Sequence, residues 1–331
     1  MKRRMILTRI EALWRAIRQE ETGNRISEGE FRLVRIDPHH PFEIYAGVDA
    51  TGSVMLAVGV SMRPPAIDAD TGALNYIRVL RAGGSWVMAL RLSASELEQV
   101  FGRLCQDLID AATHVATETA LVSLFRERLL LWKRLLRDGT SGLLQNFQVK
   151  GLIAELLALE TFMVHHPEDP AMPLMSWVGP SGTDQDFLFA NRAVEIKAVS
   201  PTADKVCIAS TEQLYAEVPL ELHVYVLRES SPTEVGAISL PVLANRIEQR
   251  LAEQSDALNT FRSKLIEAGY VEHDHYLGVS FTLMASSRYA VRDDFPRLIR
   301  SDVPDAIVDL TYSILLSSIA QFQIPETRDA A

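Results

Sequence analysis

The sequence predicts an α/β (α+β) protein in which a mixed sheet flanked by helices follows an N-terminal β-rich subdomain. Three observations indicate this class. Short apolar segments separated by Gly and Pro fill residues 31–92, which is typical of an antiparallel sheet. From residue 145 the apolar patterns run in the order helix, strand, strand, strand, helix, strand, which favours one mixed sheet between helices. The 331 residues are 47% hydrophobic and 23% charged, enough for a sizeable core.

The first predicted domain covers residues 1–93. It opens with a helix whose apolar residues recur at helical spacing, and Thr8, Arg9 and Glu11 interrupt them, so this segment is not a signal peptide. No apolar run in the sequence approaches the length of a membrane span. Five strands are expected after the helix, at FRLVRI (31–36), FEIYAGV (42–48), SVMLAVGV (53–60), YIRVL (76–80) and SWVMALRL (85–92).

Residues 94–144 are predicted to form a helical connector. Ser95 and Glu98 have the spacing of a capping box, which indicates that a helix begins there. The helix after it has an apolar stripe and a basic stripe. A basic stripe suits contact with a phosphate backbone, and the alternative is an ordinary solvated helix face. The basic stripe consists of Arg126, Lys133, Arg134 and Arg137.

The third predicted domain, residues 145–331, is the α/β region with a C-terminal extension. It begins with a helix at 145–164 that is apolar almost all round and should be buried on most sides. A short helix is expected from about Glu212 and a longer one around 241–268. Strands are expected at 186–190, 193–199, 205–211, 221–229 and 276–284.

Two of these strands, in the stretch DFLFANRAVEIK (186–197), are predicted to form a hairpin around Asn191-Arg192. In that register Asp186 lies opposite Lys197, and Glu195 lies diagonal to Asp186. Because side chains alternate between the two faces, all three share one face while Phe and Val side chains take the other. An odd-length loop would separate the acids, so the even break is part of the prediction.

Two carboxylates at this spacing can share one cation, and hard oxygen ligands favour Mg²⁺, for which Mn²⁺ ordinarily substitutes. The predicted ligands are Asp186 and Glu195, with the peptide carbonyl of Ile196 as a third. Lys197 would orient or deprotonate the attacking water, and its charge would stabilise the transition state. The alternative is that Glu195 and Lys197 are a solvated pair on an exposed strand.

Two further residues favour the catalytic interpretation. Glu155 lies on an apolar stripe of the helix 145–164, where a lone acid needs a partner or a metal. The alternative is that this side of the helix meets water. Gln213 follows the third strand, where by itself it is an ordinary helix opening.

In order along the chain, Glu155, Asp186, Glu195-x-Lys197 and Gln213 resemble the motifs of the PD-(D/E)XK nuclease superfamily, whose fold is restriction-endonuclease-like. The segments GLIAEL, SWVGP, DFLF, VEIKAV, IASTEQL and FPRL, with the later Tyr312, resemble a narrower family of bacterial restriction-associated proteins. Ala154 stands where such families often have Gly, Gln185 stands where a Pro is usual, and Asp184 competes with Asp186.

The resemblance implies an endonuclease that hydrolyses phosphodiester bonds in DNA with Mg²⁺. Asp186 and Glu195 would bind the metal, Glu155 would support it or a second metal, and Lys197 would be the catalytic lysine. Gln213 would orient the water or touch the substrate backbone. The implied setting is the cutting subunit of an anti-phage system, with DNA as substrate, a helicase-like ATPase and a methyltransferase encoded nearby, and a homodimer as an open possibility.

The composition and the absence of certain motifs count against several other classes of protein. Only Cys105 and Cys207 occur, so a cytoplasmic protein without a disulfide framework is expected. There is no P-loop, dinucleotide-binding glycine pattern or zinc spacing. The net charge is −10, of which residues 1–150 contribute +3 and residues 151–331 contribute −13. This acidity favours the second candidate function, a catalytically inactive DNA-binding or assembly subunit with the same fold.

Overall fold

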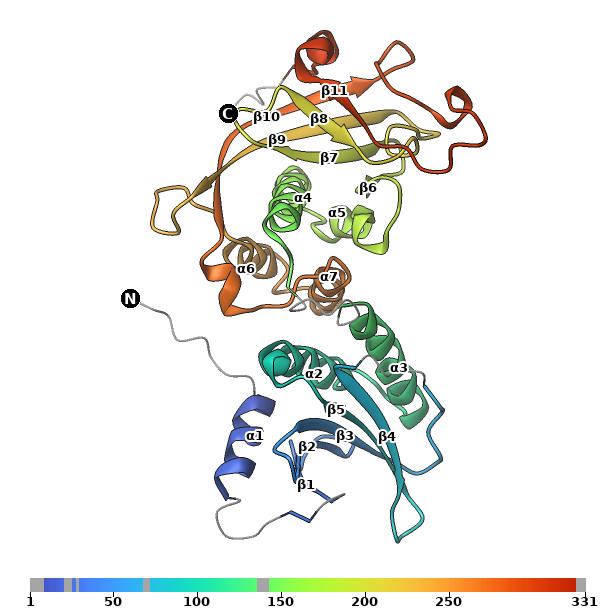
Figure 1. The fold of residues 1–331 in the computed structure, drawn as a ribbon, viewed down its shortest axis with the longest axis vertical. Coiled ribbons are helices and arrows are strands. Elements are labelled where there is room, and N and C mark those ends of the chain that lie inside the picture. The colour runs from blue at the N-terminus through green and yellow to red at the C-terminus, as the bar shows by residue number, and fades with distance from the viewer. Residues whose placement is uncertain (1–8, 21–25, 28–29, 68–71, 136–142, 326–331) are drawn as a thin grey trace. The chain divides into compact units, whose positions relative to one another are not determined.

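The computed structural model describes residues 9–20, 26–27, 30–67, 72–135 and 143–325, without the side chains of Arg134 and Leu135. The chain divides into two compact units, and each is described by itself (Figure 1). The first comprises Met1–Leu143 and Gly269–His273, and the second comprises Leu144–Ala268 and Asp274–Ala331. The division predicted from the sequence differs in giving the helices of residues 94–144 a segment of their own.

A five-stranded antiparallel sheet forms the centre of the first unit, with the strand order β1-β2-β3-β5-β4. All five predicted strands are present, because each apolar run ends at the Gly and Pro residues that separate them. Their bounds are β1 (Phe31–Arg35), β2 (Ile44–Asp49), β3 (Val54–Val60), β4 (Leu74–Leu80) and β5 (Trp86–Leu92).

Helices α1 (Arg9–Glu20), α2 (Glu98–Ala112) and α3 (Glu118–Leu135) belong to the same unit. The apolar face of α1 packs against the sheet through Trp14, whose Nε1 donates to the Met55 carbonyl at 3.0 Å. The capping box predicted at Ser95 is wrong. Ser95–Leu97 is a 3₁₀ turn without a side-chain cap, because both carboxylate oxygens of Glu98 are bound by Arg18, at 2.9 and 2.8 Å.

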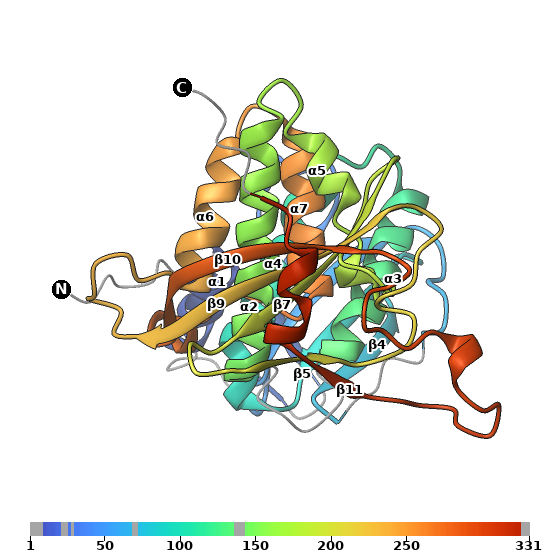
Figure 2. The ribbon, with the colours of Figure 1, turned by 90° about the horizontal axis from the view of Figure 1, so that it is seen from above.

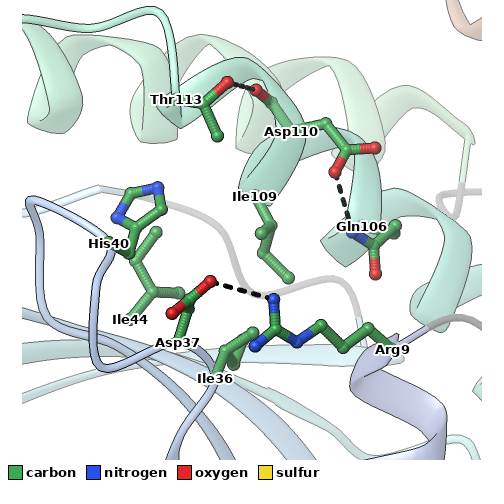
Figure 3. Close-up of a pocket in the computed structure, with 9 residues that line it drawn as sticks. All are labelled: Arg9, Ile36, Asp37, His40, Ile44, Gln106, Ile109, Asp110 and Thr113. Carbon is green, nitrogen blue, oxygen red and sulfur yellow. Dashed lines mark hydrogen bonds and ion pairs between the residues drawn. The ribbon is translucent and has the colours of Figure 1, made fainter.

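The first unit also contains a cavity of about 110 Å³ between α2 and the sheet (Figure 3). An ion pair between Arg9 and Asp37, 3.1 Å long, lies along its wall. None of the residues predicted for catalysis lines it, so it is separate from the predicted site. The lining residues are Arg9, Ile36, Asp37, His40, Ile44, Gln106, Ile109, Asp110 and Thr113.

The second unit is built on a four-stranded sheet with the order β10-β9-β7-β6. Strands β7 and β9 are parallel and the other neighbours are antiparallel, so the predicted mixed sheet is confirmed. A separate pair, β8 with β11, is antiparallel. The bounds are β6 (Phe187–Leu188), β7 (Ala193–Val199), β8 (Lys205–Ile208), β9 (Leu220–Ser230), β10 (Ser280–Val291) and β11 (Tyr312–Leu315).

Helix α4 (Asn146–His165) covers one face of this sheet, and the β8–β11 pair covers the other (Figures 1 and 2). On the α4 side, Phe162 packs edge-on against Phe187 of β6, with ring centroids 5.1 Å apart. On the far side, Leu222 and Val224 of β9 join a buried cluster with Val206 of β8. This arrangement holds β7 between two apolar layers.

The remaining helices differ from the prediction. The short helix expected from Glu212 is wrong, since residues 211–214 form only bends and a turn. The long helix expected around 241–268 is two helices, α6 (Leu240–Arg250) and α7 (Ser255–Glu267), and a short helix α5 (Ala171–Ser176) precedes β6. In the part of the chain that the structure describes, no helix is long and apolar enough to cross a membrane.

Candidate active site

The hairpin that carries the predicted acids forms, but in a different register. Phe187 pairs with Val194 and Leu188 with Ala193, so the predicted pairing of Asp186 with Lys197 is wrong by two residues. The turn is centred on Ala190-Asn191, one residue earlier than predicted, because the Phe189 amide donates to the Arg192 carbonyl at 2.8 Å. A two-residue shift leaves every side chain on its predicted face, so the acids still meet.

Asp186 lies immediately before β6 and is tied to β7 through its side chain. Its Oδ2 accepts from the Ile196 amide at 2.7 Å. The N–H and C=O of a strand residue point to the same edge, so the Ile196 carbonyl is expected on the Asp186 side too, and its ligand role stays a prediction. Asp184, the competing acid, is exposed and takes no part in these contacts.

Glu195 is the most buried of the acids, with 2% of its surface exposed. Its Oε1 contacts Lys197 Nζ at 2.7 Å. Its Oε2 is buried and, among the described residues, has no hydrogen-bond donor. An anionic oxygen in that position is costly unless a cation or a proton compensates it.

Glu155 reaches the same place from α4. Trp177, which follows α5, donates from Nε1 to Glu155 Oε2 at 2.9 Å. A Cβ atom added at Gly179 would lie 2.8 Å from Asp186 Oδ1 and 3.3 Å from Glu155 Oε2. The two carboxylates therefore face each other across a space that only a glycine at position 179 leaves open.

Lys197 and Gln213 complete the cluster. The lysine ammonium lies between Glu195 Oε1 and the side-chain oxygen of Gln213, which it contacts at 2.9 Å. The same Gln213 oxygen accepts from the Ala209 amide at 2.8 Å. Because both partners are donors, the oxygen of Gln213 must face them, and its amide nitrogen is left for another group.

The charges of these residues act on one another. Burial, followed by the negative charge of Asp186, raises the pKa of Glu155 to about 8. Burial also raises the pKa of Asp186 to about 6, although the Ile196 amide and Lys197 oppose this. The pKa of Glu195 lies well above its ordinary value, first through burial and then through Asp186. Three acids whose ionised forms are destabilised in one place are typical of a functional site.

We tested whether these residues fit the metal that the sequence predicts. The donors are all oxygens, and Asp186 Oδ1 and Glu195 Oε2 make no hydrogen bond within the described residues. The described residues contain no group of three or more His, Cys, Asp or Glu side chains already arranged around one ion. Mg²⁺ usually keeps several waters and takes one or two carboxylates, so the oxygen donors present fit it.

Two contributors were missed from the sequence, Trp177 and Gly179. Both belong to the segment SWVGP, which carries part of the family resemblance but does not by itself indicate a role for each residue. Trp177 is fully buried, and its carbonyl is bound by Lys264 of α7, so this helix anchors the segment. Burial lowers the pKa of Lys264.

The basic stripe predicted for the phosphate backbone lies on α3, in the first unit. Arg126 is exposed and Lys133 is partly buried. The side chain of Arg134 and all of Arg137 lie outside the described residues. Contact of this stripe with DNA stays a prediction.

Comparison with known proteins identifies a family. The sequence profile of a family described as "Putative PD-(D/E)XK family member, (DUF4420)" matches residues 10–317 of the chain. The chain belongs to this family. The resemblance inferred from the motifs is therefore confirmed at the level of the family, and the mixed sheet agrees with its α/β fold. No curated protein and no solved structure matches the chain.

The raised pKa values predict how the stability of this PD-(D/E)XK family member depends on pH. Because the folded-state pKa of Glu155 is about 8 against an ordinary 4.5, its protonated form stabilises the fold at low pH. That contribution is lost as pH rises toward 8, and it amounts to the order of a few kcal/mol. In EDTA, the unfolding temperature should fall by roughly 5 °C or more between pH 6 and pH 8.5.

Calorimetry of the wild-type protein and of Glu155→Gln measures this effect. Glutamine cannot ionise, so the unfolding temperature of the Glu155→Gln protein should change much less over the same pH range. In the wild-type protein at pH 8.5, saturating Mn²⁺ should raise the unfolding temperature again. Equal pH dependence in the two proteins would show that Glu155 is not buried in this way.

Proposed function

We propose that this protein is a Mg²⁺-dependent endonuclease that hydrolyses phosphodiester bonds in DNA. One observation carries the proposal. Glu155 of α4, Asp186 just before β6 and Glu195 of β7 converge beside Lys197, and Glu195 keeps a buried oxygen without a donor among the described residues. Burying three acids together costs free energy, which a divalent cation offsets.

The roles of the side chains follow from their contacts. Asp186 and Glu195, with the Ile196 carbonyl, would hold the ion, and Glu155 would support it. When bound, the ion acts as a Lewis acid that lowers the pKa of water and stabilises charge on the phosphate. The Lys197 ammonium is held in a fixed place by Glu195 and Gln213, where it orients the attacking water and stabilises the developing negative charge.

The amide nitrogen of Gln213, which has no hydrogen-bond partner among the described residues, supplies donors for a phosphate oxygen. In the reaction, the water oxygen bonds to phosphorus as the phosphorus–oxygen bond to the leaving nucleotide breaks. The water gives a proton to solvent, and the leaving oxygen takes one from solvent. Hydrolysis needs no further co-reactant, in agreement with the absence of a P-loop from the sequence.

We also propose the wider setting that the sequence resemblance implies. The protein would be the cytoplasmic cutting subunit of a restriction or anti-phage system, acting on DNA with a helicase-like ATPase and a methyltransferase. The first unit, where α3 carries Arg126, would contact the phosphate backbone.

A second candidate is a catalytically inactive DNA-binding or assembly subunit. The charge of −13 in residues 151–331 favours it, since an acidic surface repels phosphate. The buried acids count against it, because a protein without catalysis gains nothing from retaining them.

Incubation of the purified protein with supercoiled plasmid separates the two candidates. Cleavage is expected in Mg²⁺ or Mn²⁺ and not in EDTA, and it should be lost in Asp186→Asn. Asp184→Asn, two residues away on an exposed position, is the matched control and should cleave as the wild type does. Cleavage that survives Asp186→Asn would refute the mechanism, and DNA binding without any cleavage would favour the inactive subunit.

A further inference from the structure

The turn at residues 209–215 carries Gln213, and the side chain of Gln185 binds its backbone. Gln185 Nε2 donates to the carbonyl of Glu212 at 2.8 Å and to the carbonyl of Tyr215 at 2.9 Å. Because both partners are acceptors, the nitrogen of this amide must face them. Gln185 therefore binds both ends of the short segment in which Gln213 lies.

Arg297 binds the same turn through a third carbonyl. Its Nη1 donates to the Leu214 carbonyl at 2.7 Å. Leu214 itself is fully buried and belongs to the same apolar cluster as Phe295. Arg297 lies in the FPRL segment, which carries part of the family resemblance but has no role in the proposed chemistry.

Tyr312, the other late feature of the sequence pattern, supports this segment. Its hydroxyl accepts from the Leu298 amide at 3.2 Å. The residue next to Arg297 is thus tied to β11, so the guanidinium extends from a backbone that is itself held in place.

The position of the turn decides where Lys197 lies. The Gln213 oxygen holds the ammonium at 2.9 Å, and the ammonium also contacts Glu195 at 2.7 Å. A turn released from Gln185 or Arg297 would carry the Gln213 oxygen away and leave Lys197 with one fixed partner instead of two.

We infer that Gln185 and Arg297 are positioning residues, which hold the Gln213 turn and through it the Lys197 ammonium beside the acids. Neither side chain hydrogen-bonds Lys197 directly. The effect on DNA cleavage rests on the proposed function, whereas the effect on the position of Lys197 does not.

The position of Lys197 can be tested without nuclease activity, by measuring how fast an amine-acylating reagent modifies each lysine, with mass spectrometry as the readout. Gln185→Met and Arg297→Met remove the donors at similar side-chain length. Modification of Lys197 should become about tenfold faster in each, as in Gln213→Ala, because the ammonium loses a hydrogen-bonded partner. Lys205, exposed on β8, is the internal control and should not change.

A double-mutant cycle distinguishes positioning through Gln213 from general loosening of the fold. Gln185→Met added to Gln213→Ala should cause no further increase at Lys197, since the two changes remove the same contact. Arg297→Lys keeps one donor and should restore slow modification. Gln185 and Arg297 bind different carbonyls of the turn, so either methionine variant alone can test the inference if the other does not fold by circular dichroism.

The outcomes are distinct. Unchanged modification of Lys197 in both methionine variants, or effects that add to Gln213→Ala, would overturn the inference. In the cleavage assay, kcat should fall about tenfold while the KM for DNA stays constant. If Lys197 responds as expected but the wild-type protein cleaves no DNA, the proposed function fails and the positioning role remains.

Discussion

Replacing Lys197 with alanine is expected to reduce the rate of DNA cleavage by about three orders of magnitude while leaving the fold intact. The ammonium is fixed between Glu195 and Gln213, where the proposed mechanism develops negative charge. Loss of one such preorganised group typically costs about 100- to 1,000-fold. Single-turnover cleavage of a labelled duplex in Mn²⁺ measures the rate.

The matched control is Lys205→Ala, an exposed lysine on β8 of the same unit, which should cleave at the wild-type rate. The Lys197→Ala protein should still bind Mn²⁺, because the carboxylates remain. A loss of less than about tenfold would show that the ammonium only neutralises Glu195 and takes no part in the reaction.

Gly179→Ala is expected to close the space between two of the acids. The new methyl group would lie 2.8 Å from Asp186 Oδ1 and 3.2 Å from the Asp186 Cα. The first distance is too short for a carbon–oxygen contact, so the Asp186 carboxylate must move. Affinity for Mn²⁺ should fall by about 10- to 100-fold, as it does when the groups that orient metal ligands are altered.

The comparison is Gly151→Ala, in α4 of the same unit. A Cβ there would meet nothing within 4 Å, and alanine favours helix, so this variant should bind Mn²⁺ normally and unfold no earlier. For Gly179→Ala, overpacking should also cost roughly 1–3 kcal/mol of unfolding free energy. Unchanged Mn²⁺ affinity in a folded Gly179→Ala protein would show that the space beside Gly179 is not part of the metal site.

The hairpin shows which features of the site could be predicted from the sequence and which could not. The alternation of apolar and charged residues in 186–197 assigned each side chain to a face, and the even length of the turn kept the acids together. The exact pairing could not be predicted, because a shift of two residues satisfies the same alternation. The observed register follows from the Phe189 amide bonding to the Arg192 carbonyl.

Glu155 was predictable because an acid on an apolar helical stripe needs a partner. Its partner Trp177 was not, since a tryptophan in a loop gives no indication of which helix its indole will face. The role of Gly179 could not be predicted either, because it depends on two carboxylates that approach from other parts of the chain. Long-range contacts of this kind leave no periodic signal in the sequence.

The turn that carries Gln213 was predicted as a helix because Thr211-Glu212-Gln213 is a common helix opening. Tertiary contacts decide otherwise. Gln185 and Arg297 bind three carbonyls of the segment, and those carbonyls are then not available for a helical hydrogen-bond ladder. Local propensity is outweighed here by side chains from 27 or more positions away in the sequence.

Direct titration with Mn²⁺, followed by electron paramagnetic resonance or calorimetry, tests whether the acids form a cation site. The wild-type protein should bind Mn²⁺ at a site that Mg²⁺ displaces. Glu195→Gln should lose more than about tenfold in affinity while Asp184→Asn keeps it, because the first removes a predicted ligand and the second an exposed acid. Equal Mn²⁺ affinity in the wild-type and Glu195→Gln proteins would contradict the metal site and the nuclease mechanism built on it.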